Sequence, residues 1–509
     1  MSAAVAAAAL HQKLHGQWHM PYFFDEMWRA DMVRSSDHVD RMLSHNTPAA
    51  IGWILTMWAI TTPIGTGPGA LRMASLVFFP VAAAISSLVL LRIVEWAPRD
   101  RIGRRPTRPV AALAAGLAPA LVVLLPAAWR YYYLNNYAFE VAYVAALTWA
   151  AVSLDRHRWT WPVLLAGIAG LPLFTVGGSL TAPAFLACAA WWAWHRPRSE
   201  RRRRLIGLGA SAGAFAALGA VVYLRLWRPI TSGQGIEDYW VGEDATIGGK
   251  LSFGELIGKL LSQAHHDLLG DRIMAASPAM ITVATLVLVA GLVVGLVSLG
   301  RRWPWFVAIP ASAYALALGG AFVAHWPITL ERVNLCFYWM VYVAAAYGVL
   351  RMVTLPFPRH PAIALPAILL LGPVLFPAPF DPSPTAFARW MTADLDAIAA
   401  STAPHNVVLA YHPMSHFYAH DRLVNGQEGG AERFTVVRDR IGDEALYQPI
   451  DATIADHDLR SGDVVWCVIP YDLGLDRSLQ ACRFSPDAPV DKVVDERGTG
   501  TWIQGWRVR

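Results

Sequence analysis

The feature that most constrains this chain is a succession of apolar runs whose lengths suit a lipid bilayer. A spanning helix needs roughly 20 mostly apolar residues, and about ten such runs, at most 11, can be read from the sequence. Charged residues make up 16% of the chain, whereas a soluble domain usually carries about 25%. The sequence therefore predicts a mainly α, polytopic transmembrane bundle. The predicted spans are 71–95, 109–128, 138–154, 160–174, 176–194, 205–226, 278–299, 303–325, 335–353 and 362–379.

Two neighbouring runs, 160–174 and 176–194, are short and are separated by a break near Pro172 and Gly177–Gly178. They are interpreted either as two spans or as one span with a re-entrant piece. Residues 49–62 are apolar but too few to cross a bilayer. They are predicted to form a helix in the membrane interface, where Trp53 and Trp58 suit that depth.

Arginine clusters occupy every second connection between the predicted spans. Because cytoplasmic loops carry an excess of Arg and Lys, these connections are predicted to face the cytoplasm. The outward segments are then 1–70, 129–137, 227–277, 326–334 and 380–509. The net charge of +5 thus reflects membrane topology and gives no sign of a nucleic-acid partner. The clusters are Arg99–Arg108, Asp155–Arg158, Arg196–Arg204, Arg301–Arg302 and Arg351–Arg359.

The two ends of the chain differ from the span region, so three parts are predicted: 1–70, 71–379 and 380–509. Residues 1–70 are predicted to be the first outward segment. Two alternatives explain how this segment reaches the outside: a spanning helix ahead of it is missing, or residues 1–20 dock on the membrane surface. Residues 380–509 gain polar and turn residues, and β-like runs at 406–411 and 463–470 predict a small extracytoplasmic α/β domain. In that location a Cys467–Cys482 disulfide is possible.

An acidic pair, Asp25 and Glu26, stands among aromatic residues where the first outward segment meets the membrane. A carboxylate close to a low-dielectric region has a raised pKa and suits a general base. The alternative is an ordinary interfacial helix start, because acidic residues favour the first helical turn. The residues alone leave both interpretations open.

Several short motifs follow the acidic pair in a fixed order. His45–Pro48 precedes the short apolar helix, Leu71–Arg72 opens the first long span, and Arg130–Tyr133 with Tyr137–Ala138 and Glu331–Asn334 stand in later outward segments. This order resembles the GT-C superfamily of membrane glycosyltransferases, in the branch of protein O-mannosyltransferases and the lipid A aminoarabinose transferase. Asp25–Glu26 resembles that family's acidic motif of the first outside loop, and His45–Pro48 resembles its His-Pro-Pro-Leu element, of which the second Pro is absent.

The resemblance implies an enzyme that moves a sugar from a polyprenyl-phosphate carrier to a cell-envelope glycan, lipid or protein, with inversion. Asp25 or Glu26 would be the base, with Asp25 better aligned, and the donor phosphate would be bound by Arg332, Arg72 and Arg130. His45, Tyr133, His265 and His266 are further substrate-binding candidates. The resemblance leaves open whether a divalent cation, Mg or Mn, takes part. An Arg-rich, Lys-poor composition suggests a bacterium and hence its cytoplasmic (inner) membrane.

Other polar residues have both a functional and an ordinary structural interpretation. His265–His266–Asp267 could bind a metal or phosphate or lie on a surface, and His412, His416 and His420 could share a helix face. Glu140, near the end of a predicted span, is either functional or snorkels to the interface. A non-catalytic scaffold and a lipid or glycan transporter remain the alternative functions.

Overall fold

The structure is a computed structural model that describes most of the chain. The described residues are 3–8, 24–44, 49–65, 67–95, 108–122, 134–229, 254–255, 258–259, 262, 278–323, 326, 331–354, 393–410, 419–425, 430–438, 457–470, 489–497 and 501–509. The chain divides into two compact units, one of residues 1–18 and 28–380, the other of residues 19–27 and 381–509.

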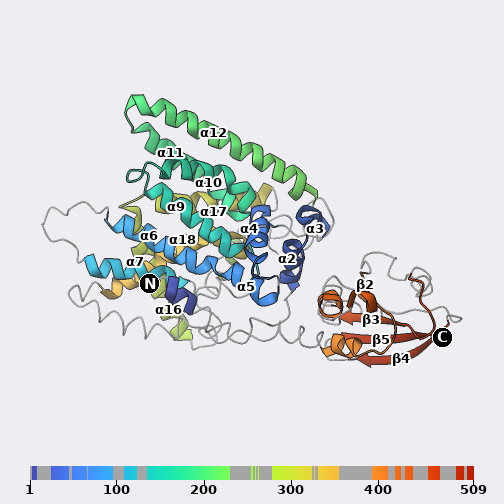
Figure 1. Cartoon of the computed structure of the whole chain (residues 1–509). Helices are drawn as coiled ribbons and strands as arrows, with labels where there is room; N and C mark the ends of the chain where they lie inside the picture. Colours follow the sequence, from blue (N-terminus) through green and yellow to red (C-terminus); the bar gives the residue numbers. More distant parts are fainter. Residues whose placement is uncertain are drawn as a thin grey trace. The chain divides into compact units, whose positions relative to one another are not determined.

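The first unit is helical, and every predicted span up to residue 353 coincides with a helix (Figure 1). The last predicted span, 362–379, lies outside the described residues. The helices are α2 (Phe24–Arg34), α3 (His38–Ser44), α4 (Ile51–Thr61), α5 (Pro68–Leu76), α6 (Phe78–Glu95), α7 (Arg108–Val122), α9 (Tyr137–Val152), α10 (Thr160–Phe174), η1 (Gly177–Thr181), α11 (Ala182–Trp194), α12 (Arg198–Val222), η2 (Tyr223–Trp227), α16 (Pro278–Gly300), α17 (Trp305–Val323) and α18 (Glu331–Thr354).

Four helical segments among the described residues are long and apolar enough to cross a membrane. They are Gly69–Val94, Arg198–Trp227, Ile281–Gly300 and Asn334–Met352. Other helices at predicted spans are shorter, such as α9 with 16 residues and α10 with 15. The prediction of a multi-pass membrane protein is therefore confirmed, and the remaining spans stay predictions.

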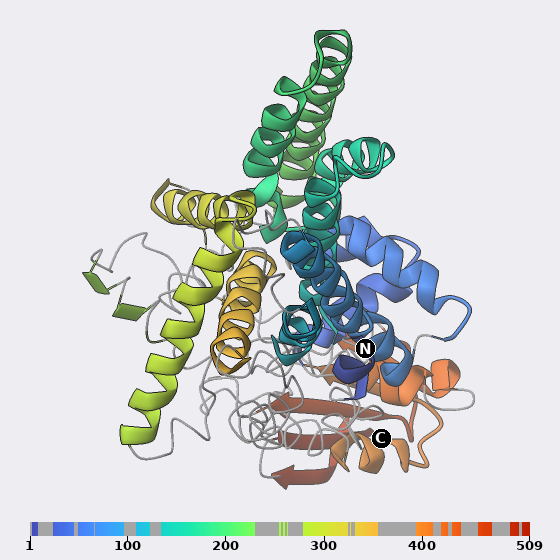
Figure 2. The same ribbon diagram turned by 90° about the vertical axis from the view of Figure 1, so that its left-hand side faces the viewer.

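Helix α18 lies at the centre of the bundle and packs against α7, α9, α16 and α17. Figure 2 shows α16 (yellow-green) running beside α18 (gold). Gly291, Gly295 and Gly348 form this contact, and a Cβ at Gly348 would overlap the carbonyl oxygen of Gly291. The backbones can approach this closely only because these positions have no side chain.

Helix α12 lies along α10 and α11 and is exposed over most of its length (Figure 1). Only Ser211 and Val222 of α12 are buried, and the Ser211 hydroxyl donates to the carbonyl of Leu165 at 2.7 Å. Because the exposed residues are mostly apolar, this surface suits contact with lipid.

The predicted break between 160–174 and 176–194 is present as two separate helices, α10 and α11, joined by η1. Helix α4 coincides with the predicted interfacial segment 49–62. It buries Trp53, Ile54 and Met57 and exposes Leu55 and Trp58. One apolar face is therefore packed on protein while the other is left for an apolar environment.

The second unit contains a five-stranded sheet of order β2-β1-β3-β5-β4. Strand β1 is buried along its whole length and pairs in parallel with β2 and with the central strand β3, while β5 pairs antiparallel with β3 and β4. The predicted small α/β domain is confirmed, and β4 and β5 form an antiparallel hairpin at its C-terminal end. The strands are β1 (Asn406–Ala410), β2 (Phe434–Arg438), β3 (Val464–Pro470), β4 (Val490–Arg497) and β5 (Thr501–Val508), with η4 (His420–Asn425) and α22 (Gly430–Arg433) beside them.

Candidate functional site

A buried carboxylate organises one end of the helical unit. Glu140, in the first turn of α9, is 1% exposed. It accepts hydrogen bonds from the backbone N–H groups of Val176 (2.8 Å), Gly177 (3.1 Å) and Gly178 (3.3 Å), and from the side-chain amide of Asn136. The alternative that Glu140 snorkels to the interface is therefore wrong, because its charge is satisfied inside the protein.

The local sequence explains why three successive amides point at one carboxylate. Thr175 ends α10 in an extended conformation, and its hydroxyl donates to the carbonyl of Leu171 at 2.9 Å. A side chain at Gly178 would meet that of Thr175. The chain can therefore turn tightly into η1 and leave its first N–H groups free for an anion, as helix N-termini do.

Two asparagines at the start of α9 extend this arrangement. The backbone N–H of Asn136 donates to Asn135 Oδ1 at 2.7 Å, while Asn136 Nδ2 donates to Glu140. These bonds fix how both amides are turned. Asn135 Nδ2 and Asn136 Oδ1 are buried and have no hydrogen-bond partner among the described residues. Asn135 Nδ2 is a hydrogen-bond donor, whereas Asn136 Oδ1 is an acceptor. We call Asn135, Asn136, Glu140 and the amides of 176–178 the Asn–Glu cluster.

Helix α5 is joined to this cluster by Ser75. The Ser75 hydroxyl donates to the carbonyl of Asn135 at 2.9 Å and lies 3.2 Å from its amide nitrogen, which donates back. Arg72, one turn earlier on the same face of α5, is 3% exposed. The structure thus places one predicted phosphate-binding arginine on the helix that contacts the Asn–Glu cluster.

The start of α18 lies at the same end. Helix α18 packs against both η1 and α9. Asn334 is fully buried and accepts a hydrogen bond from Trp326 Nε1 at 3.0 Å. Arg332 lies in the first turn of α18, two residues before Asn334. Ser75 in the last turn of α5, the start of α9 and η1 therefore meet at one end of the bundle, and α18 packs against η1.

The opposite ends of α6 and α9 are joined as well, which agrees with the predicted alternation of the connections. Arg92 near the end of α6 forms an ion pair with Asp155, just after α9, at 3.1 Å. Asp155 belongs to a connection that the arginine pattern assigns to the cytoplasm.

The structure describes only some of the other predicted site residues. Asp25 and Glu26 lie at the start of α2, and Glu26 is buried. The described residues contain no group of three His, Cys, Asp or Glu side chains arranged to hold a metal ion. His45, Arg130, Tyr133, His265, His266, His412 and His416 lie outside the described residues.

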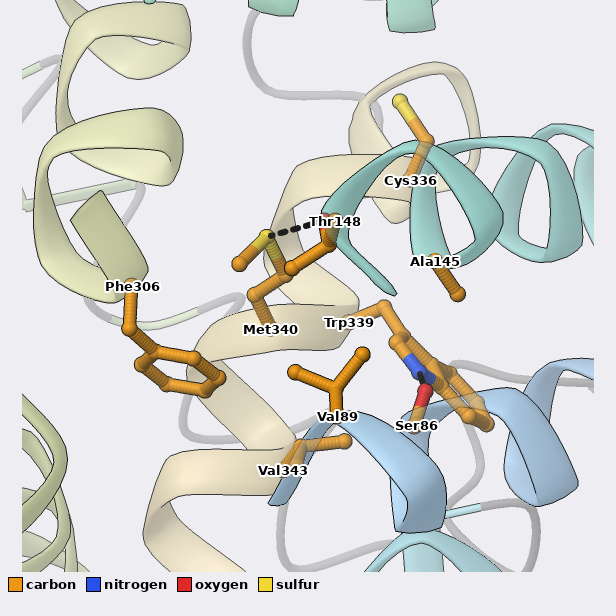
Figure 3. A pocket seen from close by; sticks show the side chains of 9 residues that line it. All are labelled: Ser86, Val89, Ala145, Thr148, Phe306, Cys336, Trp339, Met340 and Val343. Carbon is orange, nitrogen blue, oxygen red and sulfur yellow. Dashed lines mark hydrogen bonds between the residues drawn. The ribbon is translucent and has the colours of Figure 1, made fainter. Parts of the chain in front are cut away.

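A small cavity lies between α6, α9, α17 and α18 (Figure 3). Trp339 Nε1 donates to Ser86 Oγ at 2.9 Å, and Thr148 Oγ1 contacts Met340 Sδ at 4.0 Å. Most of its lining is apolar, so the cavity belongs to the packing of the bundle and adds no charged group to the cluster. Its lining residues are Ser86, Val89, Ala145, Thr148, Phe306, Cys336, Trp339, Met340 and Val343.

Asn135 and Asn136 were not among the predicted site residues. A signal was present, since two adjacent amide residues stand between aromatic residues at the start of a predicted span. Polar residues there need partners or a ligand. Gly291 and Gly295 were not singled out either, although they form a G-x-x-x-G pattern in an apolar segment that marks close helix packing.

Replacing Ser75 by alanine removes both hydrogen bonds that join α5 to the start of α9. We expect a loss of about 1–3 kcal/mol in stability, because the buried backbone groups of Asn135 are left without partners. Thermal unfolding of the purified protein in detergent measures this. Thr62→Ala is the matched control, because that exposed hydroxyl bonds only within its own helix. An equal effect of the two changes would contradict the expectation.

Fold and cluster together define a multi-pass membrane protein that has a polar, buried cluster at one end of its bundle and an α/β domain in a second compact unit. No protein family and no curated protein matches the chain. One solved structure that is similar is described as the crystal structure of ArnT from Cupriavidus metallidurans bound to undecaprenyl phosphate. The match has 14% sequence identity and a TM-score of 0.37, and covers 99% of this chain and 97% of that one.

Proposed function

We propose that this chain is a glycosyltransferase that moves a sugar from a polyprenyl-phosphate carrier to a cell-envelope acceptor at the outward end of the bundle. The observation that carries the proposal is the meeting of α5, α9, η1 and α18 at one end. Arg72 and Arg332, the two arginines predicted to bind the donor phosphate, lie on two of these helices, Arg72 in the middle of α5 and Arg332 in the first turn of α18. The motif order in the sequence supplies the reaction class.

A lipid phosphate needs positive charge around it when it leaves the sugar. Guanidinium groups bind phosphate through paired hydrogen bonds. The starts of α9 and α18 add partial positive charge, because helix N-termini carry unsatisfied N–H groups. The unpartnered donor of Asn135 and acceptor of Asn136 suit a hydroxyl group, which both accepts and donates. A sugar carries such groups.

In the proposed step, an acceptor hydroxyl attacks the anomeric carbon of the sugar from the face opposite the phosphate. The new C–O bond forms as the sugar–phosphate bond breaks, and the electron pair leaves with the polyprenyl phosphate. A carboxylate takes the hydroxyl proton, and the anomeric centre is inverted. Glu140 is poorly suited to this role, because four hydrogen bonds already occupy its oxygens. Asp25 or Glu26 is the proposed base, and a divalent cation (Mg or Mn) would add to the charge of the arginines.

The proposed location is a bacterial cytoplasmic membrane with the C-terminal domain on the outside. Cys467 is disulfide-bonded, whereas Cys188 and Cys336 are free. Disulfides persist in oxidising compartments outside the cytoplasm. The disulfide agrees with the predicted Cys467–Cys482 pair and supports this orientation; Cys482 itself lies outside the described residues.

The test is transfer from polyprenyl-phosphate sugar in membranes that contain Asp25→Asn or Glu26→Gln. Removing a general base should lower the rate about 10²–10⁴-fold, and unused donor should accumulate. Asp37→Asn is the matched control, because Asp37 is an exposed carboxylate between α2 and α3. Each variant is checked for normal amounts in the membrane. If both variants transfer sugar like the wild type, a scaffold or transporter is the better interpretation.

A further inference from the structure

A cluster of arginines and tryptophans lies at the end of α10, α11 and α12 that is remote from η1. Arg196 lies over the ring of Trp192 at 4.1 Å, and Arg204 lies over the same ring at 4.5 Å. Trp161, at the start of α10, stacks on Trp192 with ring centres 5.2 Å apart. Arg201 lies over Trp194 at 4.9 Å. We call these six residues the Arg–Trp cluster. The helices that carry them lie side by side in Figures 1 and 2.

The cluster offers hydrogen-bond donors with no acceptor to match. Trp192 Nε1 and Arg201 Nε are buried and have no hydrogen-bond partner among the described residues. Arg302 Nη1, just before α17, is in the same state, and Trp305 at the start of α17 contacts Trp191 of α11. Unsatisfied buried donors are costly. Arg201 Nη2 donates to the carbonyl of Arg196 at 3.5 Å, but Trp192 Nε1 and Arg201 Nε within the cluster remain unsatisfied, and they suit an anion with several oxygens.

Glu200, the acidic residue of this turn, does not supply the acceptor that these donors lack. Glu200 is paired with Arg204 at 2.8 Å on the surface of α12. Between residues 196 and 204 the sequence has six arginines and this one carboxylate. The excess positive charge therefore remains available to a ligand.

The surroundings indicate what kind of anion fits. Trp191 and Trp194 are 55% and 59% exposed, and the rest of α12 exposes apolar side chains such as Ile206. Exposed tryptophans next to a basic end are typical of the level of lipid headgroups. The apolar length of α12 beyond them suits acyl chains. An amphipathic anion, with a charged headgroup and acyl chains, fits both the basic end and the apolar length of α12.

We propose that the Arg–Trp cluster binds the headgroup of an anionic phospholipid, with its phosphate on Arg201, Arg204 and Trp192 Nε1 and its chains along α12. Guanidinium groups meet phosphate oxygens with paired hydrogen bonds, and Trp192 Nε1 supplies a further donor. This site lies at the other end of α10 and α11 from the Asn–Glu cluster and does not depend on the proposed reaction.

The experiment compares binding of phosphatidylglycerol and phosphatidylcholine to the full-length protein in detergent by native mass spectrometry. The wild type should prefer phosphatidylglycerol. Arg201→Gln with Arg204→Gln should weaken its binding about thirtyfold, and Arg201→Gln alone about fivefold, since each basic residue near such a headgroup contributes about 1 kcal/mol. The single variant leaves the Glu200 pair without change, so it remains informative if the double variant folds poorly.

The matched control is Arg202→Gln with Arg203→Gln, which removes the same charge from the same turn but from exposed side chains. This control should keep most of the preference for phosphatidylglycerol. An equal loss in both double variants would overturn the proposal in favour of diffuse surface charge. Equal binding of the two lipids by the wild type would also overturn it. Displacement of phosphatidylglycerol by millimolar inorganic phosphate would instead indicate a site for a free anion.

Discussion

Replacing Glu140 by leucine should destabilise the protein by about 3–5 kcal/mol, because removing one partner from a buried charged network strands the others. The side chain of Glu140 accepts hydrogen bonds from three consecutive backbone amides and from Asn136. Leucine fills a similar volume but accepts none of them. No water can enter freely at 1% exposure to replace the lost acceptor.

The measurement is thermal unfolding in detergent, followed by tryptophan fluorescence, together with the amount of protein recovered from membranes. Glu140→Gln tests charge separately, since glutamine keeps one acceptor oxygen but turns an N–H₂ donor toward other donors. It should fall between wild type and leucine. Glu200→Gln is the control on an exposed helix surface and should leave the unfolding temperature close to that of the wild type. A Glu140→Leu variant as stable as the wild type would mean that the η1 amides do not depend on this carboxylate.

Replacing Gly348 by leucine should prevent α16 and α18 from packing. A Cβ at 348 overlaps Gly291 backbone atoms, and one at Gly295 overlaps the backbone of Ala344. Backbone cannot turn aside as a flexible side chain can, so the helices must separate. Overpacking typically costs about 1–3 kcal/mol and occasionally more. We expect the cost of leucine at position 348 to lie at the top of that range, because α18 is central. The leucine variant should accumulate poorly, and Gly348→Ala should be clearly destabilised.

The matched control is Gly213→Ala on α12, where a Cβ meets no atom within 4 Å. Removing a glycine from a helix interior there should be neutral or stabilise by up to about 1 kcal/mol. Yields and unfolding temperatures of the two alanine variants are compared in the same detergent. If Gly348→Ala and Gly213→Ala behave alike, the close approach of α16 and α18 does not contribute to stability.

The sequence by itself determined where the helices form and that the chain belongs in a membrane. Long apolar runs form α-helices in a membrane, because a backbone in lipid must satisfy its own hydrogen bonds. The break at Gly177–Gly178 was also readable, since paired glycines interrupt an apolar helix. Arginine clusters predicted which connections lie on the same side, and the Arg92–Asp155 pair agrees with that pattern. The β-like runs at 406–411 and 463–470 likewise predicted the C-terminal sheet.

Only the tertiary structure decided what the polar residues do. Glu140 looks the same in the sequence whether it snorkels or caps η1, because its partners are amides 36 to 38 residues away. Asn135 and Asn136 gain meaning only when Ser75 of α5 fixes them beside that carboxylate. Gly291 and Gly348 are 57 positions apart in the sequence, and their contact follows from the crossing of α16 and α18. Such long-range partners depend on how helices pack, which local propensity does not specify.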